Sequence, residues 1–314
     1  MAINSLESAK KYTDALDKIL IQKAQTGFFA DNVLKAKFAG AKTVLIPDID
    51  FIGLANYDRD TGFSKAGITV SNESYSLSMD RARKLMLDRE DMDETGVANL
   101  AGQILGEYVR TMVVPECDAY VLSKLAKVAK DKSHTTTYTA SKAVTQLATA
   151  INNIQTRVGY DEELVAFLDP TMYSDVMNST EFSRHIVVSD FKKGDLNIRV
   201  KSFNGVSLIP VAAERMRDAY TFAAGTEATS STAATGGFSP ATNAGYIRAL
   251  VIPKNGASLV KKTETLRIFT PEKNIDADAY VFNYRLYYDV FVKKSNLDSI
   301  ETVITAGQTQ NTGS

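Results

Sequence analysis

An alternation of side-chain types through residues 75–87 constrains the fold more than any other feature. Tyr75, Leu77 and Met79 share one face, and Ser76, Ser78 and Asp80 the other. The alternation continues with Arg81, Arg83, Leu85 and Leu87. A period of two indicates a strand with one buried face. With "KTVLIPDIDFI" and the Gly-rich "GLANYDRDTGFSKAG" before it, this run predicts an unusually long two-stranded ribbon. Such a ribbon is marginal alone in water, so we expect it to pack on another subunit.

A long helix is predicted next, from about residue 95 to residue 131. Apolar residues recur at helical spacing from Val97 to Met112, and again from Leu122 to Ala129. The acidic cluster Glu90, Asp91, Asp93 and Glu94 favours the N-terminal end of the helix dipole. Pro115 removes one backbone hydrogen bond, so we expect a kink there.

The remainder alternates between helices and strands, which indicates an α+β fold. "LVAFL" and "GVSLIPV" read as buried strands, and Asp169–Pro170 reads as the N-cap and first residue of a helix. Residues 223–245 are small and polar, which predicts a mobile loop. Residues 280–292 form the clearest strand. Its even-numbered residues from Tyr280 to Val292 are apolar or aromatic; its other face is expected to carry Asn283, Arg285, Tyr287, Asp289 and Lys293.

Residues 1–40 read as a polar arm that "QTGFFADN" interrupts. Such a segment can bury little within its own chain, so we expect it to lie across a neighbouring subunit. The N-terminus lacks an apolar signal-peptide core, and no apolar run reaches the length of a membrane span. These features predict a soluble protein made in the cytoplasm.

Composition argues against several functional classes. The 36 Lys and Arg against 37 Asp and Glu give a formal net charge of -1, which does not suit a protein that grips DNA through its phosphates. One cysteine excludes a disulfide framework and a thiolate metal site. His134 and His185 are far apart and more consistent with ordinary surface roles than with metal ligation.

Cys117 is the only candidate nucleophile of note. Its neighbours Glu116 and Asp118 raise a thiol pKa, so packing at a kink is favoured over catalysis. We therefore predict no enzyme, no cofactor and no metal. A Cys117 hydrolase and a monomeric binding module remain the alternatives outside the structural class.

The order of these parts resembles a known family. "LDREDMDETGVANLAGQILGEYVRTMVVPECDAYVLSKLA" resembles the extended-loop strand and spine helix of tailed-phage major capsid proteins. "ELVAFLDPTMYSDVM" is similar to a step in their axial domain, and "YRLYYDVFVKKSNLDSI" to the strands that end such chains. The resemblance covers nearly the whole chain in the right order.

The resemblance implies an α+β, Hong Kong 97-like capsid fold. Its parts would be an N-terminal arm (1–42), an extended β-ribbon loop (43–80), a peripheral domain (81–136 and 258–296) with a spine helix (95–131), an axial domain (137–257 and 297–306) and a flexible tail (307–314).

It also implies a function. Hexamers and pentamers of this chain would form the icosahedral shell of a virion around double-stranded DNA, contacted non-specifically and without a membrane. A portal protein and scaffolding or decoration proteins would be further partners. An encapsulin-like compartment of the same fold, holding a cargo enzyme, is the alternative.

The resemblance makes several charged residues candidates for contacts between subunits: Arg81, Arg83, Glu107, Arg110, Glu116 and Asp118. Glu116 is expected to pair with a ribbon arginine such as Arg81. One member of the fold family joins subunits by a lysine–asparagine isopeptide bond. Lys65 and Asn274 are the corresponding candidates here, although a lysine on a loop tip more commonly serves solubility.

Overall fold

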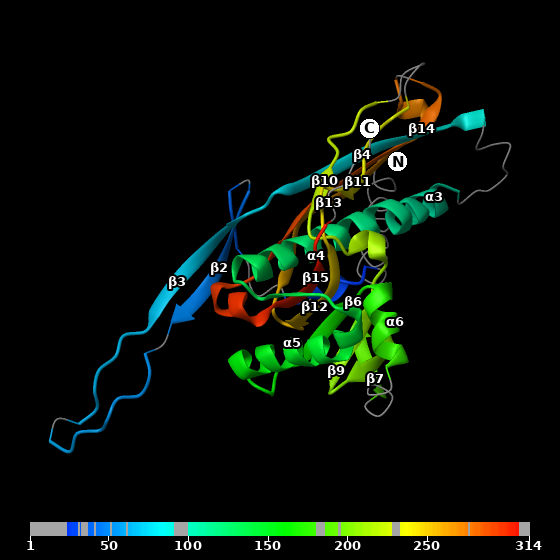
Figure 1. Cartoon of the computed structure of the whole chain (residues 1–314). Helices are drawn as coiled ribbons and strands as arrows, with labels where there is room; N and C mark the ends of the chain where they lie inside the picture. The colour runs from blue at the N-terminus through cyan, green and yellow to red at the C-terminus, as the bar shows by residue number, and fades with distance from the viewer. Residues whose placement is uncertain are drawn as a thin grey trace.

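The structure is a computed structural model, in which a layered body carries a long projecting ribbon (Figure 1). It describes residues 24–30, 32, 37–40, 42–50, 52–60, 62–90, 100–179, 186–193, 196–227, 233–275 and 277–307. In the body, a long helix lies between a seven-stranded sheet and a three-stranded sheet. Apolar residues of all three elements form one continuous core cluster.

The long helix has three parts: α3 (Leu100–Tyr108), the π-helical turn η2 (Val109–Val113) and α4 (Val114–Asp131). The predicted end at residue 131 is confirmed, whereas the predicted start and the acidic residues at 91–94 lie outside the described residues. A π-helical turn lies just before Pro115, where the sequence predicts a kink. There the Val114 N–H donates to the Val109 carbonyl, five residues back. The wider turn suits a ring that would otherwise clash with the carbonyl four residues earlier.

The three-stranded antiparallel sheet has the order β13 (Ser258–Phe269), β14 (Ala279–Phe291), β4 (Met79–Asp88). The face of β14 predicted to be apolar packs into the core, as expected. The opposite face carries Asn283, Arg285, Tyr287 and Asp289 as expected, but Tyr287, Asp289 and Phe291 are buried there as well. The cause is a second apolar cluster, in which Tyr287 and Phe291 pack against Val44 and Leu77 at the root of the ribbon.

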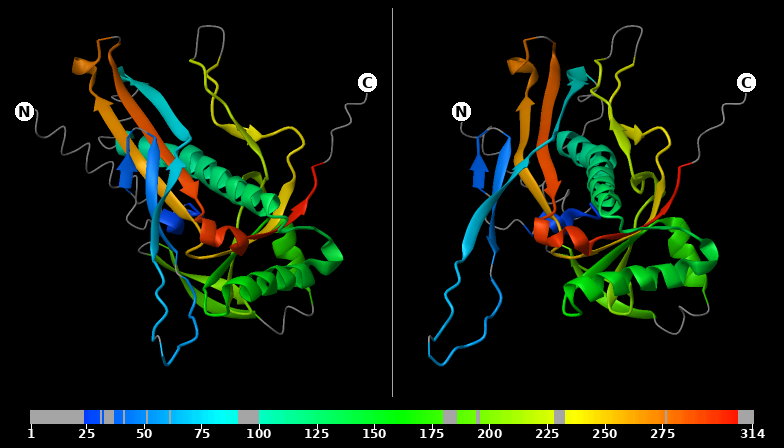
Figure 2. Two further views of the ribbon diagram at one scale, coloured as in Figure 1. Left: turned by 90° about the vertical axis from the view of Figure 1, so that its left-hand side faces the viewer. Right: turned by 60° about the vertical axis from the view of Figure 1, so that its left-hand side comes forward.

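The ribbon consists of β2 (Thr43–Asp50) and β3 (Thr69–Ser76), with the short β1 (Lys37–Ala39) beside β2. β2 and β3 pair in antiparallel register from Thr43↔Ser76 to Asp50↔Thr69. Beyond them the chain continues outward to a turn closed by the Asp58–Gly62 bridge. Figure 2 shows this segment standing away from the body in two views. Burial confirms the alternation predicted for residues 75–87.

The large sheet has seven strands, of which β5 runs parallel to β15 and β6 parallel to β9. Their order is β5 (Thr135–Thr137), β15 (Glu301–Thr305), β12 (Tyr246–Pro253), β6 (Leu164–Leu168), β9 (Val206–Pro210), β8 (Leu196–Phe203), β7 (Ile186–Lys193). One face packs on α4, and the other packs on α5 (Ala143–Val158) and α6 (Pro170–Asn178). Asp169 caps α6 as predicted, accepting a hydrogen bond from the Met172 N–H at 2.8 Å.

Short 3-10 helices and one small hairpin connect these layers. The 3-10 helices in the described part of the chain are η1 (Gly27–Ala30), η3 (Ala140–Lys142), η5 (Ala213–Arg215), η6 (Pro271–Lys273) and η7 (Lys294–Ser299). The hairpin consists of β10 (Tyr220–Phe222) and β11 (Phe238–Pro240), with a further bridge between Thr226 and Thr235. β11 and the Thr226–Thr235 bridge lie within the segment predicted to be a mobile loop (223–245), so the described parts of that segment are ordered by strand pairing.

Residues 24–30 correct the prediction for the N-terminal arm. Phe28 and Phe29 are buried in the main core, and both rings lie close to Phe167 of β6. This stretch therefore belongs to its own subunit and does not lie on a neighbour. Residues 1–23 of the predicted arm (1–42) lie outside the described residues, as does most of the predicted tail, whereas the end of the arm carries β1 beside the ribbon.

Candidate functional site

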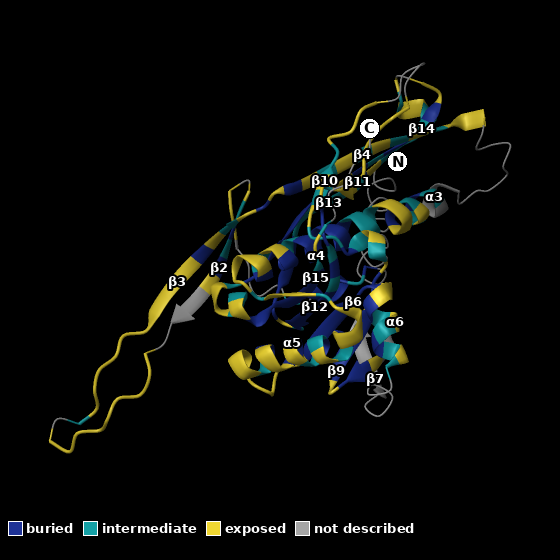
Figure 3. Ribbon diagram, in the orientation of Figure 1, coloured by how far each residue is buried: buried dark blue, intermediate teal, exposed yellow. Residues whose placement is uncertain are grey.

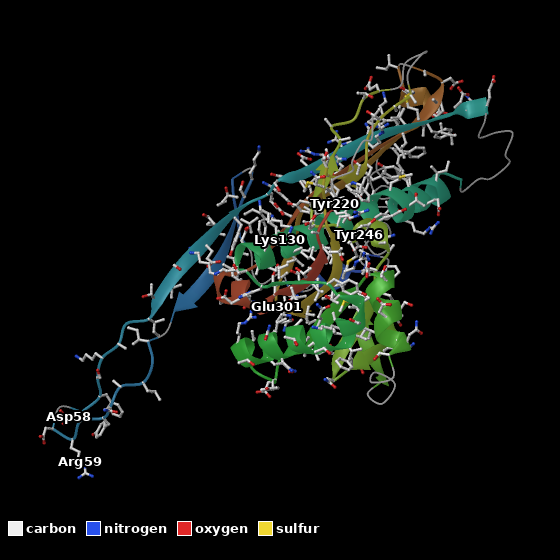
Figure 4. All side chains as sticks on the ribbon, in the orientation of Figure 1. Asp58, Arg59, Lys130, Tyr220, Tyr246 and Glu301 are labelled. Carbon is white, nitrogen blue, oxygen red and sulfur yellow. The ribbon has the colours of Figure 1, made fainter. Side chains whose placement is uncertain are left out.

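The outer part of the ribbon exposes many large apolar side chains. They are Ile52 (71%), Leu54 (107%), Tyr57 (62%), Phe63 (88%), Ile68 (65%) and Val70 (67%), with their exposed fractions in parentheses. Figure 3 shows the ribbon exposed along almost its whole outer length, and Figure 4 places Asp58 and Arg59 at its far end. Apolar side chains gathered on one projecting element mark a surface that another protein covers.

The root of the ribbon, in contrast, is fastened to the body. Val44, Ile46 and Leu77 pack against β14, and the Tyr75 hydroxyl donates to the Val292 carbonyl at 3.1 Å. The Tyr75 ring lies 4.8 Å from the ring of Phe291, centre to centre. The ribbon is therefore held at its base while its outer part is left for a partner.

Arg81 joins three elements behind the ribbon. Its Nε and Nη2 donate to the two carboxylate oxygens of Glu116 on α4, at 2.6 and 3.2 Å. Its Nη1 and Nη2 donate to the carbonyls of Ala223 and Gly237 in the hairpin, at 2.7 and 3.1 Å. The predicted Arg81–Glu116 pair thus exists within one chain. This corrects the expectation that it links two subunits.

Arg83 makes a similar contact one step further along β4. Its Nη1 donates to the Thr235 carbonyl at 2.8 Å. A Cβ atom on Gly236 would lie 3.3 Å from this guanidinium nitrogen, so glycine suits the close approach of the hairpin. Arg83 therefore also has a role within its own subunit.

Asp118 is fully buried, which corrects its expected role between subunits. Its carboxylate accepts hydrogen bonds from the Gln25 N–H (3.0 Å), the Thr26 N–H (3.0 Å) and the Thr26 hydroxyl (2.8 Å). Arg215 donates to it as well, at 3.0 Å. The carboxylate holds residues 24–30 against α4 and is not accessible to a neighbour.

Glu107 and Arg110 are the remaining candidates for inter-subunit contacts. They lie on the exposed side of the long helix, more than half exposed, and pair with each other at 2.5 Å. The hydrogen bond from Arg110 lowers the pKa of the Glu107 carboxyl. An exposed pair of this kind contributes little to subunit stability and can exchange partners with a neighbour.

Cys117 is buried, as expected for a packing residue. Burial raises the pKa of its thiol to about 12, and the negative charges of Asp118 and Glu116 act in the same direction. His134 contacts Arg157, at 3.1 Å from its Nδ1, and His185 lies outside the described residues. In the described part of the chain, no group of three or more potential metal ligands occurs, and no helix has the length and apolarity of a membrane span.

Lys65 and Asn274 do not meet within one subunit. Lys65 is exposed on the outer ribbon, whereas Asn274 follows η6 at the opposite end of the molecule (Figure 1). The Asn274 side chain donates to the Ala279 carbonyl at 3.1 Å. A bond between the two side chains would have to join different subunits.

A cleft of about 620 Å³ lies between β4, the long helix and the hairpin. Arg81, Arg83 and Glu116 line it together with Tyr108 and Phe238. Most of these polar groups already bind one another or the hairpin backbone. The cleft therefore marks the interface between the hairpin and the body of the same subunit.

Solved capsid structures match this arrangement over most of its length. The capsid structure of the cyanophage P-SCSP1u matches with a TM-score of 0.55 at 13% identity, covering 87% of this chain and 86% of that chain. The mature capsid of bacteriophage PhiM1 matches with a TM-score of 0.52 at 14% identity, covering 87% and 83%.

The chain has the fold of phage capsid proteins. This confirms the fold class predicted from the sequence. The phage capsid fold also relates the chain to a virus-like particle from Pyrococcus furiosus, with a TM-score of 0.52 at 10% identity over 95% of this chain and 99% of that chain. No family model matches the sequence, and no curated protein matches it.

Proposed function

We propose that this chain is the major capsid protein of a tailed bacteriophage. Its copies assemble, as hexamers and pentamers, into the icosahedral shell that encloses the double-stranded DNA genome. The protein is made in the host cytoplasm, becomes part of the virion and has a structural role rather than an enzymatic one. A portal protein and scaffolding or decoration proteins are its further partners.

The observation that carries this proposal is the projecting ribbon with its exposed apolar side chains. A monomer would gain nothing from an outer ribbon whose apolar side chains stay exposed, and these residues would promote unspecific aggregation. A second copy of the same chain covers these apolar side chains, and it is always present at the same concentration as the first. The phage capsid fold supports this choice of partner.

The layers of the structure support the domain division proposed from the sequence. The three-stranded sheet and the long helix correspond to the peripheral domain, and the seven-stranded sheet with α5 and α6 corresponds to the axial domain. The ribbon corresponds to the extended loop. The predicted N-terminal arm is the part of this division that needs revision, because residues 24–30 lie in the core of their own subunit.

An encapsulin-like compartment is the second candidate, favoured by one observation. The match to the virus-like particle from Pyrococcus furiosus spans 95% of this chain and 99% of the other. Such a compartment would have the same subunit but would enclose a protein cargo.

Light scattering and negative-stain electron microscopy of the purified chain test the proposal. We expect closed shells above a threshold concentration. A species of only 34.3 kDa over a wide range of concentration, salt and pH would overturn both shell functions. Particles from the native source separate them: nuclease-protected DNA supports the capsid, whereas an enclosed protein without DNA supports the compartment.

A further inference from the structure

The ribbon leaves the body at a two-residue junction, Leu77–Ser78. β3 ends at Ser76 and pairs with β2, whereas β4 begins at Met79 and pairs with β14. The strand thus changes partners at the junction. The backbone of these two residues therefore determines the direction in which the ribbon points.

One buried carboxylate binds this junction. Oδ2 of Asp289 accepts hydrogen bonds from the Ser78 N–H at 3.0 Å and from the Ser78 hydroxyl at 2.8 Å. Oδ1 accepts from the Tyr120 hydroxyl at 2.7 Å, from Lys124 Nζ at 2.5 Å and from the Val290 N–H at 2.7 Å. Asp289 is fully buried and so connects the junction to both α4 and β14.

We propose that Asp289 is the positioning residue that sets the direction of the ribbon, and with it the angle at which one subunit meets the next. The second part of this inference rests on the proposed shell function. The first part concerns the subunit alone and can be measured without any assembly.

The other contacts at the root, which include the bond from the Tyr75 hydroxyl to the Val292 carbonyl at 3.1 Å, hold the ribbon but do not bind the junction residues through a charged group. The apolar packing of Val44 and Phe291 has no preferred direction. The bond from the Tyr287 hydroxyl to the Leu77 carbonyl is long, at 3.3 Å. Hydrogen bonds to a carboxylate are shorter and directional, and two of those at Asp289 come from Ser78 itself.

The length of the ribbon makes this orientation matter. About 17 residues separate the junction from the tip, so at roughly 3.3 Å per residue the ribbon extends up to about 55 Å. A rotation of about 10° at the junction would move the tip by about 10 Å, which is twice the spacing of neighbouring strands. A shell of uniform size therefore needs the junction to be fixed.

The subunit-level experiment compares Asp289→Asn with the parent chain. Asparagine keeps the shape, but its NH2 group replaces one acceptor oxygen and faces donors. Spin labels on Lys65→Cys (outer ribbon) and Thr149→Cys (α5), in a Cys117→Ala background diluted with unlabelled subunits, report the distance between ribbon and body. We expect one narrow distance distribution in the parent and a distribution at least twofold broader in Asp289→Asn.

Asp169→Asn is the matched control. Asp169 is equally buried, caps α6 and pairs with Arg248, far from the junction. Its substitution should lower the melting temperature without broadening the distance distribution. Equal broadening in both variants, or none in Asp289→Asn, would overturn the proposal.

Where Asp289→Asn fails to fold, the double variant Ser78→Ala, Tyr120→Phe takes its place. It removes two hydroxyl donors but leaves the carboxylate bound to Lys124 and to the N–H groups of Ser78 and Val290. Because one bond to the junction remains, we expect a smaller broadening than that expected for Asp289→Asn, and a distribution as narrow as that of the parent would contradict the proposal.

Cryo-electron microscopy tests the consequence for assembly. We expect shells of several sizes or open sheets from Asp289→Asn, and shells of parental size from Asp169→Asn. Uniform parental shells from Asp289→Asn would contradict the assembly part. If the parent itself forms no shells, the shell function fails, and the distance measurement still decides the role of Asp289 in the subunit.

Discussion

Among the described residues, three fully buried aspartates connect segments that are far apart in the sequence. Asp118 binds Thr26 and Arg215, Asp169 binds Arg248, and Asp289 binds Ser78 across 211 residues. A buried carboxylate costs several kcal/mol unless donors surround it. Each of these residues therefore fixes the relative position of two elements, because any shift that removes its donors is strongly unfavourable.

Cys117 yields a prediction about reactivity. With the thiol pKa raised to about 12 by burial, the thiolate is scarce at pH 8. We expect the folded subunit to react with a thiol reagent at least ~100-fold more slowly than the urea-unfolded chain. Absorbance of the released chromophore measures both rates, and equal rates would show that Cys117 is exposed.

The same thiol predicts a loss of stability at alkaline pH. The unfolded thiol loses its proton near pH 8.5, whereas the folded thiol keeps it to about 12. The contribution of the Cys117 thiol to the free energy of unfolding is therefore complete below about pH 8.5. It falls as pH rises towards 12, by up to about 1.4 kcal/mol per pH unit. Between pH 8 and 9.5, the free energy of unfolding measured with urea should fall less steeply with pH for Cys117→Ala than for the parent.

Arg81 and Glu116 predict an incomplete rescue in a charge swap. Arg81→Ala should destabilise the isolated subunit by about 2–3 kcal/mol, because two carboxylate bonds and two carbonyl bonds are lost together. Arg81→Glu with Glu116→Arg restores the ion pair, but a glutamate cannot donate to the carbonyls of Ala223 and Gly237. A double-mutant cycle measured by urea unfolding checks this. Unchanged subunit stability in Arg81→Ala would contradict the arrangement.

At the scale of elements, the core position of residues 24–30 determines which N-terminal deletions the fold of the subunit tolerates. Deleting 1–30 removes Phe28 and Phe29 from the core and leaves Asp118 with Arg215 as its one partner outside its own helix among the described residues. At about 3–5 kcal/mol for each buried phenylalanine, the loss is comparable to the whole stability of a typical domain. We expect this deletion to prevent folding, as measured by circular dichroism.

Deleting 1–23 is the matched truncation. This deletion keeps Ala24, Phe28 and Phe29 in the core, so we expect a folded subunit with a melting temperature close to that of the parent. A drop in shell yield would then assign the predicted arm contact to residues 1–23. Normal shells from this deletion would contradict the arm, and normal folding after deletion of 1–30 would contradict the core position of Phe28.

The sequence predicted the elements whose side chains repeat with a local period. The helical spacing around Leu122 and the alternation in 75–87 are confirmed because burial follows that period. In 280–292 the predicted apolar face is buried, but the other face is buried as well from Tyr287 onward. The site was less predictable. "AQTGFFA" has no period, and its partner Asp118 lies more than 90 residues away. The hairpin contacts use backbone carbonyls, which leave no trace in the choice of side chains. Tyr287 and Phe291 are buried by the ribbon root, which no pattern in β14 reveals.

At the scale of the whole molecule, the outer ribbon predicts how assembly responds to polarity. Leu54→Ser with Phe63→Ser should leave the unfolding free energy within about 0.5 kcal/mol of the parent, since both side chains are exposed. The same double variant should raise the assembly threshold at least tenfold if a second copy covers these side chains, because that burial contributes about 1.5–3 kcal/mol for each. Light scattering against concentration measures the threshold.

Tyr160→Ser is the control for this experiment. Tyr160 is an apolar side chain of similar exposure, 76%, but lies just after α5 on the body. An unchanged threshold in this variant with a raised one in the ribbon variant locates the interface on the ribbon. The opposite result would place it on the body.

The pairing of β4 with β14 also determines when the chain can fold. The Arg285 side chain of β14 donates to Asp80 of β4 across 205 residues, so β4 leaves the ribosome long before its partner strand exists. At roughly 5–20 residues per second, this delay is about 10–40 s. During that time the alternating apolar face of residues 75–87 is uncovered while other nascent copies are close by. Productive folding in the cell then depends on keeping this strand away from its counterparts until translation is nearly complete, which makes the subunit a natural client of a chaperone.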